Sequence, residues 1–198
     1  IQLRVSPGYD VYDDLTKGVA ETIKEIESLS FYTGFGNDRI KIGAIKMSVD
    51  GAFSGQAAWL MDSYPGRPGY HGVIRIPPEA LYAVGKRAHD LGWQLGVHAI
   101  GDQAVKETVD VLDRILKDAP RPDARLYIHH ISVKPPQESL EKMKANGIIA
   151  SMQPNFTYTI APFYKLALSP AKLQTNNPEK SIHDMGIRMS IGSDNLPD

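Results

Sequence analysis

No cysteine occurs among the 198 residues of this sequence. A disulfide framework and a thiolate metal site are therefore excluded, and any metal ion would be held by His, Asp, Glu or a chemically modified Lys. The sequence also has no excess of charge of one sign, since it contains 22 basic and 23 acidic residues and its net charge is −1. This balance gives no electrostatic reason to expect nucleic acid or an anionic membrane as a partner.

Long apolar runs are missing as well. No run approaches the ~18 residues of a membrane-spanning helix, and Ile1–Pro7 has neither the basic start nor the apolar core of a signal peptide. We therefore expect no membrane partner, with the cytoplasm as the default location. A hydrophobic share of 42% and a charged share of 23% are typical of a globular chain. The length allows one domain with a substantial core.

The segment Gly92–Asp102 is the most informative part of the chain. A short apolar run, Trp93–Val97, stops at His98, and an amphipathic helix is expected over Gln103–Lys117. Its apolar stripe consists of Val105, Val109, Leu112 and Leu116. Parallel α/β sheets build their sites in this way, with a polar side chain at the carboxyl end of a strand.

The rest of the chain repeats this alternation of strand and helix. Strands are expected at Gln2–Val5, Ile40–Met47, Trp93–Val97, Arg125–His129, Ile148–Met152 and Ile187–Ile191, and further helices at Tyr12–Leu29, Pro78–Leu91, Gln137–Ala145 and Glu179–Met185. Asp50–Pro78 is a long Gly- and Pro-rich loop, of a length that is usually functional or disordered. Asn155–Asn177 is irregular, with at least one helical piece. The alternation predicts a parallel sheet covered by helices, and both a barrel and a doubly wound sheet satisfy it.

Polar side chains recur where the predicted strands end, at Lys46, His98, His129, His130 and Asp194. The separations 130 − 98 = 32 and 194 − 130 = 64 match one and two β/α units of a barrel, at ~31 residues each. A barrel would bring these ends to one mouth, whereas an open sheet would spread them. Two neutral imidazoles and a carboxylate suit Zn²⁺ or a similar divalent ion. Lysine, with an ordinary pKa of ~10.4, can join them only if it is neutral or converted to an anion.

Five segments, in this order, resemble the amidohydrolase superfamily, in particular its exoenzyme-like branch that includes N-substituted formamide deformylase. They are Ile45–Gly51, Gly92–Asp102 with its His-Ala-Ile-Gly-Asp core, Arg125–Ser132, Ala150–Pro154 and Gly186–Asp194 with its final Gly-Ser-Asp. The resemblance implies a (β/α)8 barrel with a metal site at the strand carboxyl ends. It also implies that a carbamylated Lys46 bridges two metals, that His98 and His130 are metal ligands, and that Asp194 binds metal and shuttles protons.

One family feature is missing from this sequence. The His-x-His pair of the family's first strand does not occur here. The chain is therefore expected to be one partial barrel domain over residues 1–198, running from about strand three to strand eight and short of the ~250 residues of a full barrel. Its two open edges could pair with another copy, which makes a homo-oligomer an expected partner.

Several further residues are candidates for the site. Because adjacent strand residues point to opposite faces, only one of His129 and His130 should face the barrel interior, and the family position favours His130. Asp102 either caps the following helix or orients His98. Substrate contacts are expected from Asp50, unless it only forms a turn, and from His71 and Gln153.

Together these features predict a divalent-metal hydrolase, with zinc as the expected metal, that cleaves a non-peptide C–N bond of a small-molecule amide. Asp194 and His98 are its expected catalytic residues. Phosphoester hydrolysis would use the same chemistry but fits the amide-directed branch less well. The alternative, favoured by the missing His-x-His, is a catalytically inactive barrel half that binds a small molecule or another chain.

Overall fold

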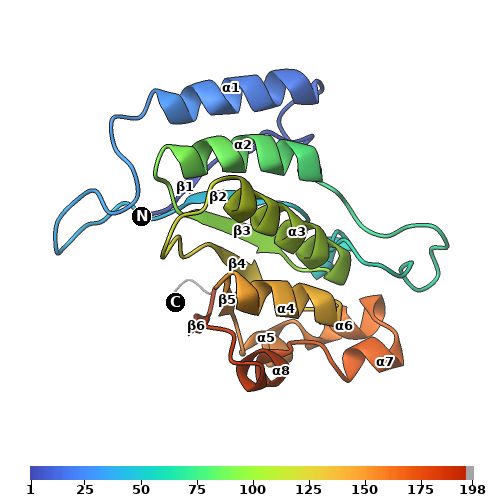
Figure 1. Cartoon of the computed structure of the whole chain (residues 1–198). Helices are drawn as coiled ribbons and strands as arrows, with labels where there is room; N and C mark the ends of the chain where they lie inside the picture. The colour runs from blue at the N-terminus through green and yellow to red at the C-terminus, as the bar shows by residue number, and fades with distance from the viewer. Residues whose placement is uncertain (195–198) are drawn as a thin grey trace.

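A computed structural model describes residues 1–194 of the chain. They form one parallel sheet in the order β1-β2-β3-β4-β5-β6 (Figure 1). Its strands are β1 (Leu3–Arg4), β2 (Ile45–Ser48), β3 (Leu95–Ala99), β4 (Tyr127–His130), β5 (Ile149–Met152) and β6 (Met189–Ile191). The helices are α1 (Leu15–Glu27), α2 (Pro78–Asp90), α3 (Asp102–Asp118), α4 (Gln137–Ala145), α5 (Phe156–Thr159), α6 (Ala161–Ala167), α7 (Pro170–Leu173) and α8 (Glu179–Asp184), with a 3-10 turn η1 (Phe53–Gly55).

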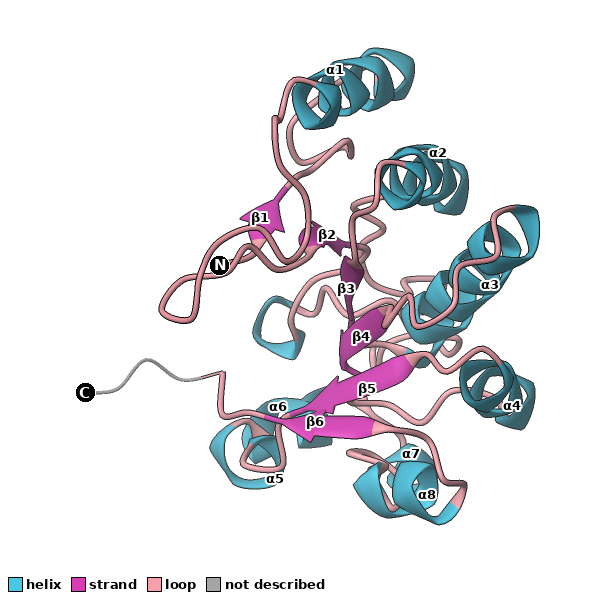
Figure 2. Ribbon diagram, turned by 60° about the vertical axis from the view of Figure 1, so that its left-hand side comes forward, coloured by secondary structure: helices cyan, strands magenta, loops and turns pink. Residues whose placement is uncertain are grey.

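The strand order distinguishes the two architectures that the sequence left open. A doubly wound sheet reverses its strand order at a switch point and carries helices on both faces, whereas a barrel adds each strand beside the previous one. Here the order never reverses, and helices α1, α2, α3, α4 and α8 lie in an arc along one side of the sheet (Figure 2). The predicted α/β fold of an incomplete barrel is confirmed.

The core lies between the sheet and this arc of helices. Side chains such as Leu95, Val97, Leu112 and Ile115 have no exposed surface. In the predicted stripe of α3, the first three residues are fully buried and Leu116 is partly buried against the same core. The amphipathic pattern therefore identified the correct face of this helix.

Every strand begins later than predicted, and the bounds of the second and third strands differ most from the prediction. The second strand begins at Ile45 rather than at Ile40, because Gly36–Lys41 folds back as a small antiparallel bridge. Gly36 has φ 131°, and a Cβ on it would lie 2.0 Å from the carbonyl oxygen of Ile40, so this turn needs glycine. The third strand continues through Ala99, so His98 lies within it rather than after it.

The long loop over Asp50–Pro78 is packed rather than loose. Phe53, Leu60 and Tyr64 are almost completely buried in a second small core, together with Tyr164 and Leu168 from the region of α6. The loop and the segment that carries α5 and α6 therefore build one wall at the carboxyl ends of the strands. Over residues 1–194, no helix is both long and apolar enough to cross a membrane.

Candidate functional site

A cavity of about 380 Å³ lies at the carboxyl ends of the strands. The four predicted metal residues, Lys46, His98, His130 and Asp194, all line it, although they come from four separate segments of the chain. The remaining wall consists of Arg4, Ser48, Asp50, Gly51, Ala52, Phe53, Ser54, Arg75, Ile100, Phe156, Ile160 and Phe163.

The strand register explains how Lys46 and His98 reach the same space. Ser48 of β2 lies opposite His98 of β3, and Lys46 lies two residues before Ser48 on the same face. Gly96 lies opposite Lys46, and a Cβ there would lie 2.3 Å from the ring of Tyr127. A glycine at this position therefore leaves the inner face open for its larger neighbours.

His130 reaches the cavity through an unusual backbone conformation. Its φ is 80° and that of the next residue, Ile131, is 52°, so β4 stops being extended at this point. The His130 ring lies 4.5 Å from that of His98, measured between centroids, and the ring of Phe156 in α5 stacks on it at 5.9 Å.

His129 lies on the same face as His98, because the register pairs the two residues. It lines a second hollow together with Gln94, Tyr127 and Ser151. The expectation that only one of His129 and His130 faces the interior was wrong, because it assumed an extended backbone at His130.

Both cavity histidines are in the neutral form that a metal ligand requires. Burial lowers the pKa of His130 to about 4, although nearby Asp194 opposes the shift. The pKa of His98 also lies well below its ordinary value, because burial disfavours the charged ring and the positive charges of Lys46 and Arg75 add to the shift. A neutral imidazole keeps a lone pair on one nitrogen, which can bind a metal ion.

Gln153 determines which nitrogen of His130 carries that lone pair. The Nδ1 of His130 lies 2.8 Å from Oε1 of Gln153, and the Gln153 amide nitrogen donates to the carbonyl oxygen of Ser151 at 3.3 Å. Because an amide oxygen can only accept, Nδ1 carries the proton and Nε2 keeps the lone pair. Gln153 therefore acts on the site through His130 and does not line the cavity.

Lys46 is the least usual member of the group. Burial lowers the pKa of its ammonium group, while Asp194 opposes the shift and Arg4 adds to it. A lowered pKa increases the share of neutral amine, the form that can be chemically modified.

The donor set fits a divalent ion in its chemistry. Within residues 1–194, no three His, Asp or Glu side chains lie close enough together to hold a metal ion. Binding of a metal ion would therefore use Lys46 as a further ligand or require a small movement of the side chains that line the cavity.

Other predicted contacts lie in different places. Asp50 lies in the cavity wall but has no exposed surface. His71 is held inside the long loop by the carbonyl oxygen of Leu60 at 3.1 Å and the hydroxyl of Ser63 at 3.4 Å, and it does not line the cavity.

Asp102 is the first residue of α3 rather than its N-cap, which is Gly101, but its carboxylate accepts from the first-turn backbone N–H of Gln103 at 3.2 Å. The buried Nε2 of His98 has no hydrogen-bond partner within residues 1–194, so Asp102 does not orient His98 through this nitrogen. The Asp102 carboxylate also accepts from the backbone N–H of Met61 at 3.0 Å and from Lys172 at 2.6 Å. The role of Asp102 is therefore to join the long loop and α7 to the start of α3.

Sequence reasoning missed part of the wall. Arg75 comes from the end of the long loop, and its charge contributes to lowering the pKa of His98. Phe53, Phe156 and Phe163 supply an apolar side. No periodic pattern marks these residues, because they lie in a loop or in helical pieces too short to show a period, and the positions of these segments depend on contacts distant in sequence.

Comparison with known proteins identifies related chains. A family model described as "Amidohydrolase family" matches residues 3–198. The chain is 30% identical over 155 residues to YtcJ of Bacillus subtilis (strain 168), a protein named as an amidohydrolase. This match covers 78% of the present chain and 28% of YtcJ. It is 28% identical over 114 residues to the protein LONG AFTER FAR-RED 3 of Arabidopsis thaliana, covering 58% of this chain and 19% of that protein.

Solved structures have the same arrangement of strands and helices. An uncharacterized metal-dependent hydrolase from Pyrococcus furiosus matches with a TM-score of 0.71 and 25% identity, over 88% of this chain and 35% of that one. A second such hydrolase, from Pyrococcus horikoshii OT3, matches with a TM-score of 0.70 and 24% identity, over 88% and 34%. The chain thus spans about a third or less of the length of each of these relatives.

Proposed function

The chain belongs to the amidohydrolase family, and on that premise we propose that this protein is a metal-dependent hydrolase that cleaves a non-peptide C–N bond of a small amide. The observation that carries this proposal is the meeting of Lys46, His98, His130 and Asp194 around one cavity. Metal-dependent hydrolases among the structural neighbours support the same reaction class.

The cavity residues would divide the metal-binding role between them. His98 and His130 are neutral donors, and Asp194 supplies a carboxylate. A carbamylated Lys46 would form when its neutral amine attacks carbon dioxide and loses a proton, which turns the side chain into an anionic oxygen donor. A bound zinc or similar ion would polarise the substrate carbonyl and lower the pKa of water toward ~7.

Asp194 is the proposed proton carrier. It would accept a proton from the water that attacks the carbonyl carbon and donate that proton to the leaving nitrogen, as a base and then as an acid. The hydroxyl remains on the acyl product, the C–N bond breaks, and the amine leaves neutral. Phe53, Phe156 and Phe163 would contact an apolar part of the substrate and keep bulk water out.

The proposal is tested by a His98→Ala substitution. We expect loss of amide hydrolysis and of most bound metal, since one of two imidazole donors disappears. Activity on a panel of N-substituted formamides and amides, together with metal content by mass spectrometry, measures both effects. His183→Ala is the matched control, because His183 lies on α8 with a side chain that is 78% exposed. Unchanged turnover in His98→Ala would contradict the proposal.

A second candidate function is a catalytically inactive barrel module that binds a small molecule or another chain. The lack of a three-ligand group of His, Asp or Glu within residues 1–194 favours it. Metal analysis distinguishes the two functions: stoichiometric zinc, manganese or iron with amidase activity supports the hydrolase, and a metal-free, inert protein supports the binding module.

A further inference from the structure

The cavity contains two arginines, Arg4 and Arg75, that the proposed reaction does not use. Within residues 1–194, neither guanidinium group forms a hydrogen bond or an ion pair. Five other arginines of these residues have such partners, namely Arg67, Arg87, Arg114, Arg121 and Arg125. Arg39 and Arg188 have none, but both are exposed and neither lines the cavity. An unpaired charge in the wall of a cavity is costly to keep there, and an anionic ligand would satisfy it.

The backbone fixes Arg75 beside the end of β2. Its N–H donates to the carbonyl oxygen of Val49 at 2.8 Å, and its carbonyl oxygen accepts from the N–H of Tyr9 at 3.0 Å. A Cβ on Gly8 would lie 2.0 Å from the same carbonyl oxygen, so this close approach requires glycine. The segments after β1 and β2 therefore both hold Arg75, although it belongs to the long loop.

Asp50, a carboxylate of the same wall, is not the partner of Arg75. It has no exposed surface. Its oxygens accept at 2.9–3.0 Å from three backbone N–H groups, those of Trp59, Ile100 and Gly101. These donors come from the long loop and from the turn between β3 and α3. The carboxylate of Asp50 thus satisfies the backbone rather than a guanidinium group.

Asp194, the other carboxylate of the wall, lies near different side chains. Its charge opposes the lowering of the pKa of Lys46 and His130 by burial. Over residues 1–194, no ion pair joins Asp194 to Arg4 or Arg75. The cavity therefore offers two guanidinium groups for which the described chain provides no acceptor.

The arginines and the apolar side chains lie in different parts of the wall. Arg4 lies on β1, and Arg75 is held beside the neighbouring strand β2. Phe156, Ile160 and Phe163 come from the segment of α5 and α6, which follows β5 near the other end of the sheet (Figure 2). The predicted metal ligands of β2, β3 and β4 lie between these parts. A substrate at those ligands would meet arginines toward one end of the sheet and aromatic rings toward the other.

We infer that the substrate carries a carboxylate, which Arg75 and Arg4 bind, and an apolar group, which the phenylalanines contact. The planar fork of a guanidinium group matches the two oxygens of a carboxylate and can donate two parallel hydrogen bonds to it. This inference rests on the proposed function and narrows its substrate class. Small amides that bear both groups, such as N-acylated amino acids with apolar side chains, belong to that class.

The test is the binding of two compounds to the protein after treatment with a chelator, which prevents the carboxylate from binding a metal ion instead. N-formylphenylalanine and N-formylphenethylamine differ only by the carboxylate. We expect N-formylphenylalanine to bind about 10- to 100-fold more tightly, the range of a hydrogen bond between charged groups, and the ratio to fall at high salt. Isothermal titration calorimetry measures both dissociation constants. Equal affinities, or no binding of N-formylphenylalanine, would overturn the inference.

Substitutions assign the effect to the arginines. Arg75→Gln should reduce the ratio of the two dissociation constants to near one, whereas Arg75→Lys should keep part of it, because an ammonium group retains the charge but lacks the fork. Arg4→Gln should lower the ratio as well. Arg39→Gln is the matched control, since it removes the same charge from an exposed turn outside the cavity. It should leave the ratio unchanged.

A third compound tests the choice of a carboxylate. Arginine also binds phosphate-like groups, so the phosphonate analogue of N-formylphenylalanine is measured in the same way. We expect it to bind more weakly than the carboxylate. Tighter binding of the phosphonate would overturn the assignment of a carboxylate.

The outcomes separate this inference from the proposed function. A full carboxylate preference in a folded Arg75→Gln protein overturns the role of Arg75, even if His98→Ala abolishes hydrolysis. A preference that depends on Arg75, in a protein that hydrolyses no amide, supports the role of Arg75 and removes the proposed function instead.

Discussion

His130 illustrates how single residues prepare the cavity. Its positive φ turns the ring toward His98, and its hydrogen bond to Gln153 leaves Nε2 with the lone pair. Such a conformation is uncommon for a non-glycine residue and tends to occur where function requires it. Partners that hold the far side of a metal-binding imidazole commonly tune its affinity.

Gln153→Leu tests this arrangement. The buried Nδ1–H of His130 would lose its acceptor, so we expect a loss of about 1–3 kcal/mol in the free energy of unfolding and an approximately tenfold weaker affinity for zinc. Urea denaturation and zinc titration measure the two effects. Gln137→Leu is the control, because Gln137 lies on the exposed start of α4. Full zinc affinity in Gln153→Leu would show that His130 does not depend on this bond.

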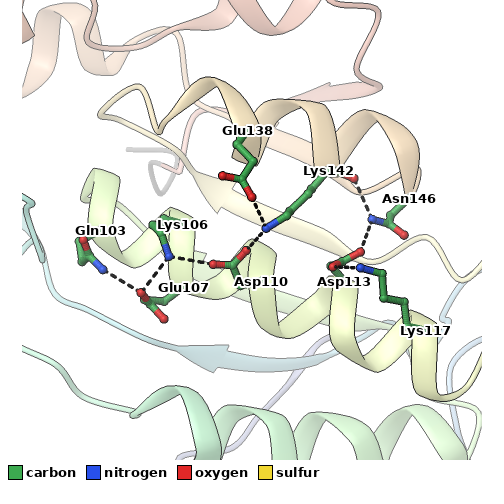
Figure 3. Close-up of polar contacts among 9 residues, drawn as sticks. All are labelled: Gln103, Lys106, Glu107, Asp110, Asp113, Lys117, Glu138, Lys142 and Asn146. Carbon is green, nitrogen blue, oxygen red and sulfur yellow. Dashed lines mark hydrogen bonds and ion pairs between the residues drawn. The ribbon is translucent and has the colours of Figure 1, made fainter.

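Charged side chains join helices α3 and α4 on the outer surface of the molecule. Asp110 of α3 accepts from Lys106 at 2.9 Å and from Lys142 of α4 at 2.7 Å (Figure 3). Asp113 accepts from Asn146 at 2.9 Å and from Lys117 at 2.7 Å in the same way. Because each carboxylate has two partners, these networks fix the position of α4 along α3.

Asp110 should make stability depend on pH. Burial raises the pKa of this carboxyl, but the bonds from Lys106 and Lys142 outweigh it, so the pKa in the folded protein lies below the ordinary 3.8. A depressed folded pKa adds stability that is present above the unfolded value and is lost as the pH falls through the folded one. We expect Asp110→Asn to be less stable than the wild type at pH 7, and the difference to shrink below about pH 4.

Urea denaturation between pH 7 and pH 3 measures this difference. Glu138→Gln is the control, because the carboxylate of Glu138 also pairs with Lys142 but is 74% exposed. Exposed ion pairs add little to the free energy of unfolding. A constant difference in the free energy of unfolding between the wild type and Asp110→Asn over this pH range would contradict the lowered pKa of Asp110.

The whole molecule is a sector of a barrel whose sheet, within residues 1–194, ends at β1 and β6. Both edge strands are short, with two and three residues. Short edges limit pairing with other chains but do not abolish it. Ile191 of β6 is 68% exposed and places an apolar side chain on one of these edges.

We expect the protein to self-associate through this edge, and Ile191→Lys to reduce the association, because a charge on an edge strand opposes pairing. Sedimentation velocity over a range of protein concentrations measures the effect. Leu166→Lys is the matched control, because Leu166 lies on α6 and is 66% exposed. Equal association of Ile191→Lys and the wild type would exclude this edge as the contact.

The sequence by itself determined the six strands, the helices α1, α2, α3, α4 and α8, and the side chains that stand at the strand ends. Hydrophobic periodicity records which face of an element is buried, so the stripe of α3 and the bounds of α4 could be predicted directly. Regular strand spacing predicted His98, His130 and Asp194 as site residues, and the family resemblance added Lys46 to them.

Only the tertiary structure decided the order of the strands, the positive φ of His130, the contribution of Arg75 to the wall and the backbone hydrogen bonds to Asp50. Each of these depends on contacts between residues far apart in the chain. Asp50, for example, receives donors from residues 9, 50 and 51 positions away. Local patterns carry no record of such distances, because the energy that selects these contacts exists only once the chain has folded.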